Sequence, residues 1–182
     1  KDFLVHPLQL DEAAAAGAGG VLLLVALLDT AQLERMVLRA LELRLFVLIE
    51  AFDEAELQTA TRMARGREDR VLVGLNCRDL RTLQVQPERF AALAPGLPTG
   101  LVCVAESGLE LPADAARVAQ LGYRMALVGS ALMRAPDPAE RVRQMVAHGR
   151  ATAGVPQVKI CGLKTRQDVH AAVDAGADGL GF

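Results

Sequence analysis

The chain has 182 residues, a length that suits one domain or one domain and part of another. Its residues are 52% hydrophobic and 23% charged, with a formal net charge of −2 at pH 7, which predicts a sizeable core. This charge gives no electrostatic reason to bind nucleic acid or an anionic membrane, so we expect neither as a partner. The most apolar stretch, residues 13–28, contains three glycines and is too short to span a bilayer.

The cysteines indicate the compartment. Cys77, Cys103 and Cys161 are odd in number and lie far apart in the sequence. That pattern fits reduced thiols in a cytoplasm better than a disulfide framework or a zinc site. We therefore expect a cytoplasmic protein without a structural metal.

Short apolar runs alternate regularly with amphipathic segments. Residues 30–44, for example, place Leu33 and Met36 on one face and Glu34 and Arg35 on the other, which is typical of a surface helix. The apolar runs are continuous, which indicates strands buried on both faces, and the alternation predicts βαβ units with a parallel sheet. The predicted strands cover residues 3–5, 21–26, 45–50, 71–75, 101–105, 125–128 and 158–161.

Local signals mark the ends of several helices. Asp53 with Glu56 forms a capping-box pattern, and Pro112 and Pro138 suit first-turn positions. Gly122 suits the stop of a helix before the next strand. These signals agree with the alternation of strands and helices.

The alternation of predicted strands and helices is interrupted once, near residue 150. Residues 148–157 contain two glycines and one proline, which favour a linker. We predict one domain over residues 1–150, a linker over 151–157 and the start of a second unit over 158–182.

Polar residues lie at the ends of the predicted strands. In a parallel βα barrel, active-site groups project from the carboxyl ends of several strands, and phosphate is bound after the last two. The pattern predicts such a barrel, and a sequence whose first residue is a strand-end Lys is expected to begin inside a domain. The strand-end residues are Lys1, Glu50, Asn76-Cys77-Arg78-Asp79, Glu106-Ser107-Gly108 and Gly129-Ser130.

Each of these residues also has a plain structural interpretation. Lys1 at a barrel mouth could be desolvated and act as a general acid, whereas a terminal Lys is ordinarily solvated. Glu50 needs a cation or a donor if it is buried, and a structural ion pair explains it as well as catalysis does. Asn76 and Arg78 could orient a hydroxyl or bind a carboxylate, or they could form an ordinary turn.

The glycine-containing turns raise similar alternatives. Ser107-Gly108 could be a nucleophile elbow, a phosphate cradle or a simple turn, but the sequence lacks the first Gly of G-x-S-x-G. Backbone N–H groups beside short helix starts can approach anionic oxygens closely. Gly108 together with Gly129 and Ser130 therefore predicts a phosphate site.

Taken in order, the motifs of residues 1–150 resemble the indole-3-glycerol phosphate synthase family. The resemblance implies strands 3–8 of an incomplete TIM (βα)8 barrel, without metal or organic cofactor. It implies decarboxylating ring closure of 1-(2-carboxyphenylamino)-1-deoxyribulose 5-phosphate in tryptophan biosynthesis. The motifs that carry it are Lys1-Asp2-Phe3 with Gln9, residues 22–28, Glu50, residues 74–80 with Thr82, Ala105-Glu106-Ser107-Gly108, and residues 127–130 with Leu132-Met133.

The resemblance also assigns roles. Lys1 would be the general acid, while Glu50 and Asn76 would position and polarise the intermediate. The residues that would line the substrate site are Arg78, Glu106 and Ser107, and those that would hold the phosphate are Gly108, Gly129 and Ser130.

The sequence departs from the family pattern in three respects. Family members usually have His where this chain has Phe52, and a second Asn where it has Cys77. The segments for the first two strands, with a catalytic carboxylate and a second active-site Lys, are absent. Six strands cannot close an eight-strand barrel, so we expect an open edge that invites self-association and a fragment with little or no activity.

Residues 158–182 resemble the start of the phosphoribosylanthranilate isomerase family. The resemblance rests on Val158 to Thr165, Asp168, residues 175–178 and the final Gly181-Phe182. It implies the first β-α-β of a second TIM barrel and gives Cys161 the role of general base, which requires an accessible thiolate. The expected protein is therefore a bifunctional synthase-isomerase. Its alternatives are a non-catalytic half-barrel that needs a complementary chain, or another phosphate-binding (βα)8 enzyme.

Overall fold

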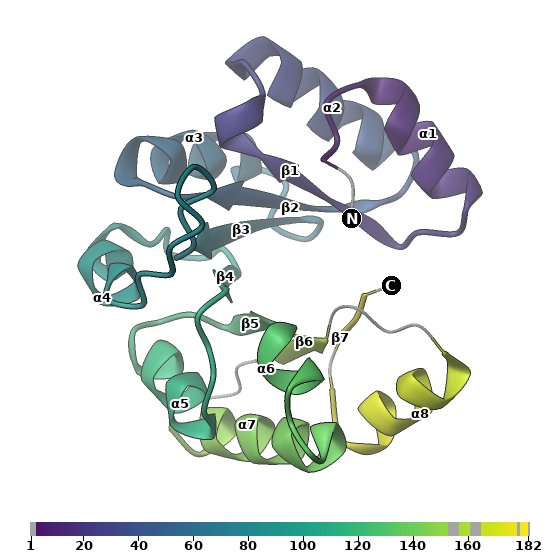
Figure 1. The fold of residues 1–182 in the computed structure, drawn as a ribbon. Helices are drawn as coiled ribbons and strands as arrows, with labels where there is room; N and C mark the ends of the chain where they lie inside the picture. The colour runs from purple at the N-terminus through teal and green to yellow at the C-terminus, as the bar shows by residue number, and fades with distance from the viewer. Residues whose placement is uncertain (1–2, 153–156, 161–164, 178, 182) are drawn as a thin grey trace. The chain divides into compact units, whose positions relative to one another are not determined.

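The computed structural model describes residues 3–152, 157–160, 165–177 and 179–181. The chain forms two compact units. Unit 1 comprises residues 1–76 and 96–102, and unit 2 comprises residues 77–95 and 103–182. Each unit is built from parallel strands joined by helices, so the predicted α/β class is confirmed (Figure 1).

Unit 1 contains a parallel sheet in the order β1-β2-β3, with helices on one of its faces (Figure 1). Leu24 lies beside Glu50 on the next strand, and Glu50 lies beside Gly74 on the third. The elements are α1 (Pro7–Ala15), β1 (Gly20–Leu24), the 3-10 turn η1 (Val25–Leu27), α2 (Thr30–Glu42), β2 (Phe46–Ala51), α3 (Glu54–Ala64) and β3 (Val71–Asn76).

One apolar core holds unit 1 together. Leu10 of α1, Leu33 of α2 and Leu57 of α3 pack with Leu23 and Ile49 of the strands. Continuous apolar runs in β1 to β3 supply the sheet side of this core, as the sequence pattern predicts. The predicted helix over residues 30–44 is confirmed as α2, and Asp29 caps it by accepting a hydrogen bond from the Gln32 N–H at 2.7 Å.

The predicted strand over residues 3–5 is wrong, because this segment is not paired with any described strand. Its backbone groups are instead bonded to side-chain amides. The Val5 N–H donates to Gln9 Oε1 at 2.7 Å, and the Val5 carbonyl accepts from Gln32 Nε2 at 2.6 Å. Side-chain donors and acceptors thus replace the ladder that an apolar run of this kind predicts.

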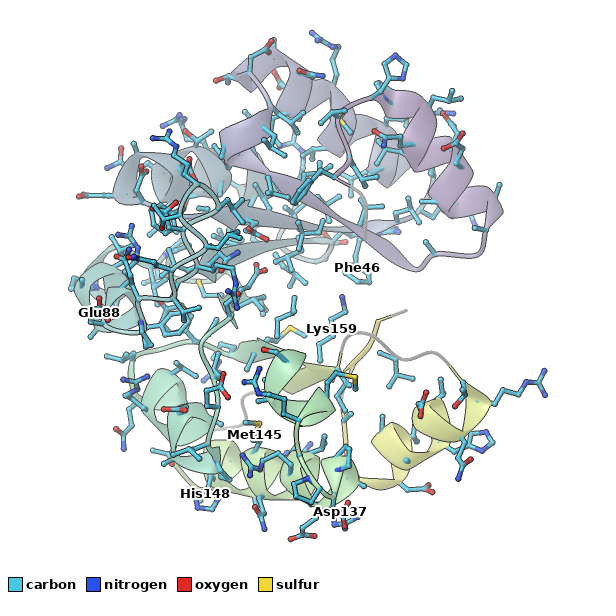
Figure 2. All side chains as sticks on the ribbon, viewed as in Figure 1. Phe46, Glu88, Asp137, Met145, His148 and Lys159 are labelled. Atoms are coloured by element: carbon cyan, nitrogen blue, oxygen red, sulfur yellow. The ribbon has the colours of Figure 1, made fainter. Side chains whose placement is uncertain are left out.

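Unit 2 contains a second parallel series, β4-β5-β6-β7, with α5 and α7 packed side by side (Figure 1). Met145 of α7 is buried, whereas Asp137 and His148 are exposed (Figure 2). The elements are α4 (Arg89–Leu93), the 3-10 turn η2 (Ala94–Gly96), β4 (Cys103–Glu106), α5 (Pro112–Gln120), β5 (Met125–Val128), α6 (Ser130–Met133), α7 (Pro138–Thr152), β6 (Gln157–Ile160), α8 (Arg166–Asp174) and β7 (Gly179–Leu180).

The strand that follows the predicted linker extends the sheet of unit 2. Met125 of β5 lies beside Gln157 of β6, and Lys159 lies beside Gly179 of β7. Residues 153–156 of the predicted linker lie outside the described residues. The boundary over residues 151–157 stays a prediction.

Helix ends follow the sequence signals closely. Asp53 accepts from the Glu56 N–H at 2.9 Å, and the Glu56 carboxylate accepts from the Phe52 N–H at 2.8 Å. Gly122 follows α5 with φ +99°, a conformation that suits a glycine helix stop. In the part of the chain that the structure describes, no helix has both the length and the apolar character to cross a membrane.

Two leucines on α2 allow a matched test of the core of unit 1. Leu33 is 0% exposed and Leu38 is 43% exposed. We expect Leu33→Ala to lower the free energy of unfolding by about 2–5 kcal/mol, since it leaves a cavity in the core. Leu38→Ala should cost less than about 1 kcal/mol. Urea unfolding measures both, and equal losses would contradict the assignment of the buried face.

Candidate active site

Glu50 and Asn76 form a buried polar pair in unit 1. Glu50 lies in β2 beside Gly74 of β3, and Asn76 is two residues further along β3. Residues i and i+2 of a strand share a face, so the Asn76 side chain stands diagonally next to Glu50. Asn76 Nδ2 donates to Glu50 Oε1 at 2.7 Å, with exposed fractions of 7% and 5%.

This pair shows which group satisfies the buried carboxylate of Glu50. A buried carboxylate requires a donor, and Asn76 provides one. The sequence interpretation expected a Lys partner for Glu50, but Lys1 lies outside the described residues. The arrangement presents a carboxylate and an amide at the carboxyl ends of neighbouring strands, where they can form hydrogen bonds with a hydroxyl or a carbonyl.

In unit 2, the residues after Asn76 form a closed loop. The Cys77 N–H donates to the Glu106 carbonyl at 3.0 Å, and the Gln86 N–H donates to the Cys77 carbonyl at 2.8 Å. Arg78 pairs with Val85 in an antiparallel bridge. Cys77 therefore links the start and the end of the loop to the end of β4.

The predicted substrate residue Arg78 and its neighbour Asp79 both form hydrogen bonds within this loop. Arg78 Nη1 donates to the Leu83 carbonyl at 3.2 Å. Asp79 Oδ1 accepts from the N–H groups of Arg81 at 2.7 Å and Thr82 at 3.2 Å, and these hydrogen bonds, led by that of Arg81, lower the Asp79 pKa. The ordinary-turn interpretation is correct for Asp79.

The strand end at Glu106 turns sharply. Glu106 is buried at the end of β4, and both Ser107 and Gly108 have φ +65°. A Cβ atom at position 108 would lie 2.6 Å from Cys77 Sγ and 2.8 Å from Val85 Cγ1. Glycine is required here both for its backbone conformation and for this close approach. Ser107 adopts the left-handed region without that freedom, a sign of a constrained turn.

The second predicted phosphate turn follows the neighbouring strand. Glu106 of β4 lies beside Leu127 of β5, so Gly108 and Gly129 follow the same edge of this sheet. The Gly129 carbonyl accepts from the Leu132 N–H at 2.9 Å, which begins the short helix α6 at Ser130. The structure thus brings the predicted phosphate residues to adjacent strand ends within unit 2, and their role remains a proposal.

The described cysteines, Cys77 and Cys103, are buried. Burial raises the pKa of Cys103 to about 11 and also raises the pKa of Cys77. A thiolate is therefore scarce at neutral pH, which supports a packing role for both residues. Cys161, the predicted isomerase base, lies outside the described residues.

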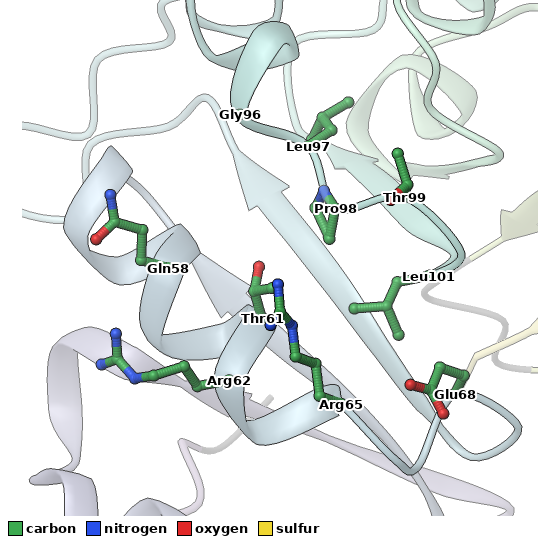
Figure 3. Close-up of a pocket in the computed structure, with 10 residues that line it drawn as sticks. All are labelled: Gln58, Thr61, Arg62, Arg65, Glu68, Gly96, Leu97, Pro98, Thr99 and Leu101. Carbon is green, nitrogen blue, oxygen red and sulfur yellow. The ribbon is translucent and has the colours of Figure 1, made fainter.

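A cavity in unit 1 contains none of the predicted site residues (Figure 3). It has a volume of about 740 Å³ and lies between α3 and residues 96–101. Glu68 and Leu101 line it, and they precede β3 and β4. Barrel enzymes place their chemistry at the opposite, carboxyl ends of the strands, so this cavity is not the candidate active site.

Sequence reasoning missed Gln32, whose amide holds the Val5 carbonyl. A Gln in the first turn of an amphipathic helix carries no signal of such a contact, because the two residues are 27 positions apart. Among the residues that the structure describes, no three His, Cys, Asp or Glu side chains are grouped so that they could hold a metal ion.

The fold and the strand-end residues define the class of incomplete parallel (βα)8-barrel proteins. A citrate synthase variant, SbnG, has a crystal structure that covers 98% of this chain and 82% of its own, with a TM-score of 0.65 and 13% identity, which shows the fold alone. The family model "Indole-3-glycerol phosphate synthase" matches residues 1–145. The chain belongs to the indole-3-glycerol phosphate synthase family.

Curated relatives agree with this family. An indole-3-glycerol phosphate synthase from Nocardioides sp. is 47% identical over 80% of this chain and 54% of its own length. One from Aromatoleum aromaticum is 43% identical over 80% and 53%. A multifunctional tryptophan biosynthesis protein from Schizosaccharomyces pombe is 33% identical over 100% of this chain and 24% of its own length. The chain spans about half the length of the two synthases, 54% and 53%.

A double-mutant cycle can measure the interaction energy between Glu50 and Asn76. We expect Asn76→Ala and Glu50→Ala each to lower the free energy of unfolding, with a coupling energy of about 1–3 kcal/mol, since each substitution removes one end of a buried hydrogen bond to a carboxylate. Chemical unfolding of the two single variants and the double variant provides the values. Additive losses would show that the 2.7 Å contact does not link the two side chains in solution.

The turn at Gly108 allows a second stability test. Gly108→Ala should combine backbone strain with overpacking and cost about 2–4 kcal/mol. Gly100 has φ +83° and no atom within 4 Å of its would-be Cβ, so Gly100→Ala reports strain alone, about 1 kcal/mol. Adding Cys77→Ala to Gly108→Ala should restore part of the loss. Equal costs at both glycines would contradict the close packing of Cys77 against the turn.

Proposed function

We propose that this chain is part of an indole-3-glycerol phosphate synthase that acts on 1-(2-carboxyphenylamino)-1-deoxyribulose 5-phosphate. The observation that carries the proposal is the buried Glu50–Asn76 hydrogen bond at the strand ends of a chain that belongs to this family. The reaction forms a bond between the aromatic carbon that bears the carboxylate and the ketone carbon. It releases CO₂ and then the former ketone oxygen as water.

The proposed roles follow from the charges that develop. Lys1 protonates the ketone oxygen as the carbon–carbon bond forms, because this oxygen gains negative charge. Glu50 and Asn76 position and polarise the intermediate, since a carboxylate accepts and an amide N–H donates hydrogen bonds. The hydrogen bond between the two side chains supports this assignment by holding both groups in one orientation.

Unit 2 supports the binding part of the proposal. Arg78, Glu106 and Ser107 line the substrate site, and Gly108, Gly129 and Ser130 hold its phosphate. The support comes from the two turns that follow the adjacent strands β4 and β5, where backbone N–H groups can meet an anion. The reaction needs no metal or organic cofactor.

We also propose that the whole protein is a bifunctional synthase-isomerase of the cytoplasm. The S. pombe multifunctional relative aligns with 100% of this chain, including the residues beyond the family match at 145. In this proposal, residues 158–182 begin a phosphoribosylanthranilate isomerase barrel, and Cys161 is its general base. The 182-residue fragment itself turns over little or no substrate, because its barrel is incomplete.

Indole fluorescence tests the synthase proposal. The chain has no Trp and one Tyr, so newly formed indole emits against a nearly dark protein. We expect no signal from the chain alone and a signal when a peptide with the first three strands of the family is added, because residues 3–5 form no strand. Asn76→Ala should lower kcat of the mixture by about 10²-fold, because it removes a donor from the reacting site.

Controls separate the alternatives. A folded mixture without turnover, whose mass rises with concentration, would replace the enzyme with a self-associating half-barrel. Turnover that survives substitution of Glu50 and Asn76 would favour another phosphate-binding barrel chemistry. Gln58→Ala on the exposed face of α3 serves as the neutral control. Turnover by the unsupplemented chain at the rate of the mixture would overturn the proposed inactivity.

A further inference from the structure

The loop of residues 77–87 packs against the turn proposed to hold phosphate. A Cβ atom at position 108 would lie 2.8 Å from Val85 Cγ1 and 3.5 Å from Pro87 Cγ, in addition to its 2.6 Å approach to Cys77 Sγ. Side chains from both ends of the loop thus fill the space where a larger residue at position 108 would have its own side chain. The position of the Gly108 backbone is therefore limited by this loop.

Backbone contacts close the loop into a hairpin. Arg78 pairs with Val85 in an antiparallel bridge, and the Asp79 N–H donates to the Gln84 carbonyl at 2.9 Å. The side chain of Arg78 adds a hydrogen bond to the Leu83 carbonyl at 3.2 Å. Val85 therefore approaches the turn from a backbone that is fixed relative to Arg78, a predicted substrate residue.

The turn itself depends on packing. Ser107 and Gly108 both have φ +65°, and neither forms a backbone hydrogen bond among the residues that the structure describes. Consecutive left-handed residues persist where the surrounding structure holds them. The contacts of Gly108 with Cys77 and Val85 supply that support on the side where a Cβ atom would lie.

We propose that Val85 is a positioning residue for the phosphate of the substrate. The inference rests on the proposed function, in which Gly108 binds this phosphate through the turn. A backbone N–H stabilises an anion only where it points at an oxygen within hydrogen-bond distance, so a displaced turn loses the contact. Val85 is 37% exposed, whereas Cys77 is fully buried, so truncation of Val85 changes the support of the turn with little loss of core packing.

Phosphate binding by the 182-residue chain tests the inference without turnover. In a titration with inorganic phosphate followed by NMR, we expect the amide signals of Gly108, Gly129 and Ser130 to shift saturably in the wild type. Val85→Ala should raise the dissociation constant at least about tenfold, because loss of one hydrogen bond to a charged group has about this effect. Val85→Thr keeps the branched shape and should bind as the wild type does. Leu83→Ala, on the same loop and 65% exposed, is the matched control and should also bind normally.

The outcomes separate the inference from the proposed function. A wild-type chain whose turn amides do not respond to phosphate would overturn the phosphate site and the inference together. A wild type that binds phosphate, with an unchanged dissociation constant in Val85→Ala, would overturn the inference alone. Equal weakening by Val85→Thr or Leu83→Ala would also overturn it, since the shape of Val85 would then not be the cause.

Kinetics of the peptide-supplemented mixture provide a second readout. Phosphate is held equally in the ground state and the transition state, so Val85→Ala should raise KM about tenfold and leave kcat near the wild-type value. Val85→Thr should restore KM. A fall in kcat at unchanged KM would contradict a role in phosphate positioning. An inactive wild-type mixture with the expected phosphate titration would count against the synthase proposal and leave the positioning role supported.

Discussion

The candidate site depends on one requirement, that a carboxylate buried at the end of a strand must have a hydrogen-bond donor. Glu50 is nearly inaccessible, and Asn76 supplies the donor from the neighbouring strand. A parallel register that places Glu50 beside Gly74 makes this contact possible, because Asn76, two residues further along β3, then lies on the same face as Glu50. The same apolar strands that form the core of unit 1 thus orient its polar pair. Both the packing of unit 1 and the orientation of the Glu50–Asn76 pair therefore depend on this register.

In unit 2, a buried side chain packs closely against a turn of the candidate site. Cys77 packs against Gly108 while its backbone groups bond to Glu106 and Gln86. The residue where the family usually has Asn is here a buried thiol beneath the turn proposed to hold phosphate. A small apolar side chain suits that place, since burial raises its pKa and keeps it neutral. The departure at Cys77 is therefore explained as packing, whereas Phe52 contributes its N–H to the Glu56 cap.

The backbone of residues 3–6 is held by side chains rather than by a strand. Glutamine side chains there perform the task that a neighbouring strand performs for the other apolar runs. Amides suit this task because each carries both a donor and an acceptor. A segment held by side chains can be shifted by single substitutions, unlike a strand held by a continuous ladder.

The sequence by itself determined the α/β class, helix α2, the capping of α3 and the positions of Glu50, Asn76 and Glu106 at strand ends. These features depend on periodicity and on residues close together in the chain, which is why they could be predicted. Tertiary structure alone decided that Asn76 meets Glu50 across 26 positions, that Cys77 lies under Gly108, and that residues 3–5 bind two glutamines instead of a strand. Contacts of this kind follow from strand register and from the placement of helices on the sheet, and no local pattern specifies either.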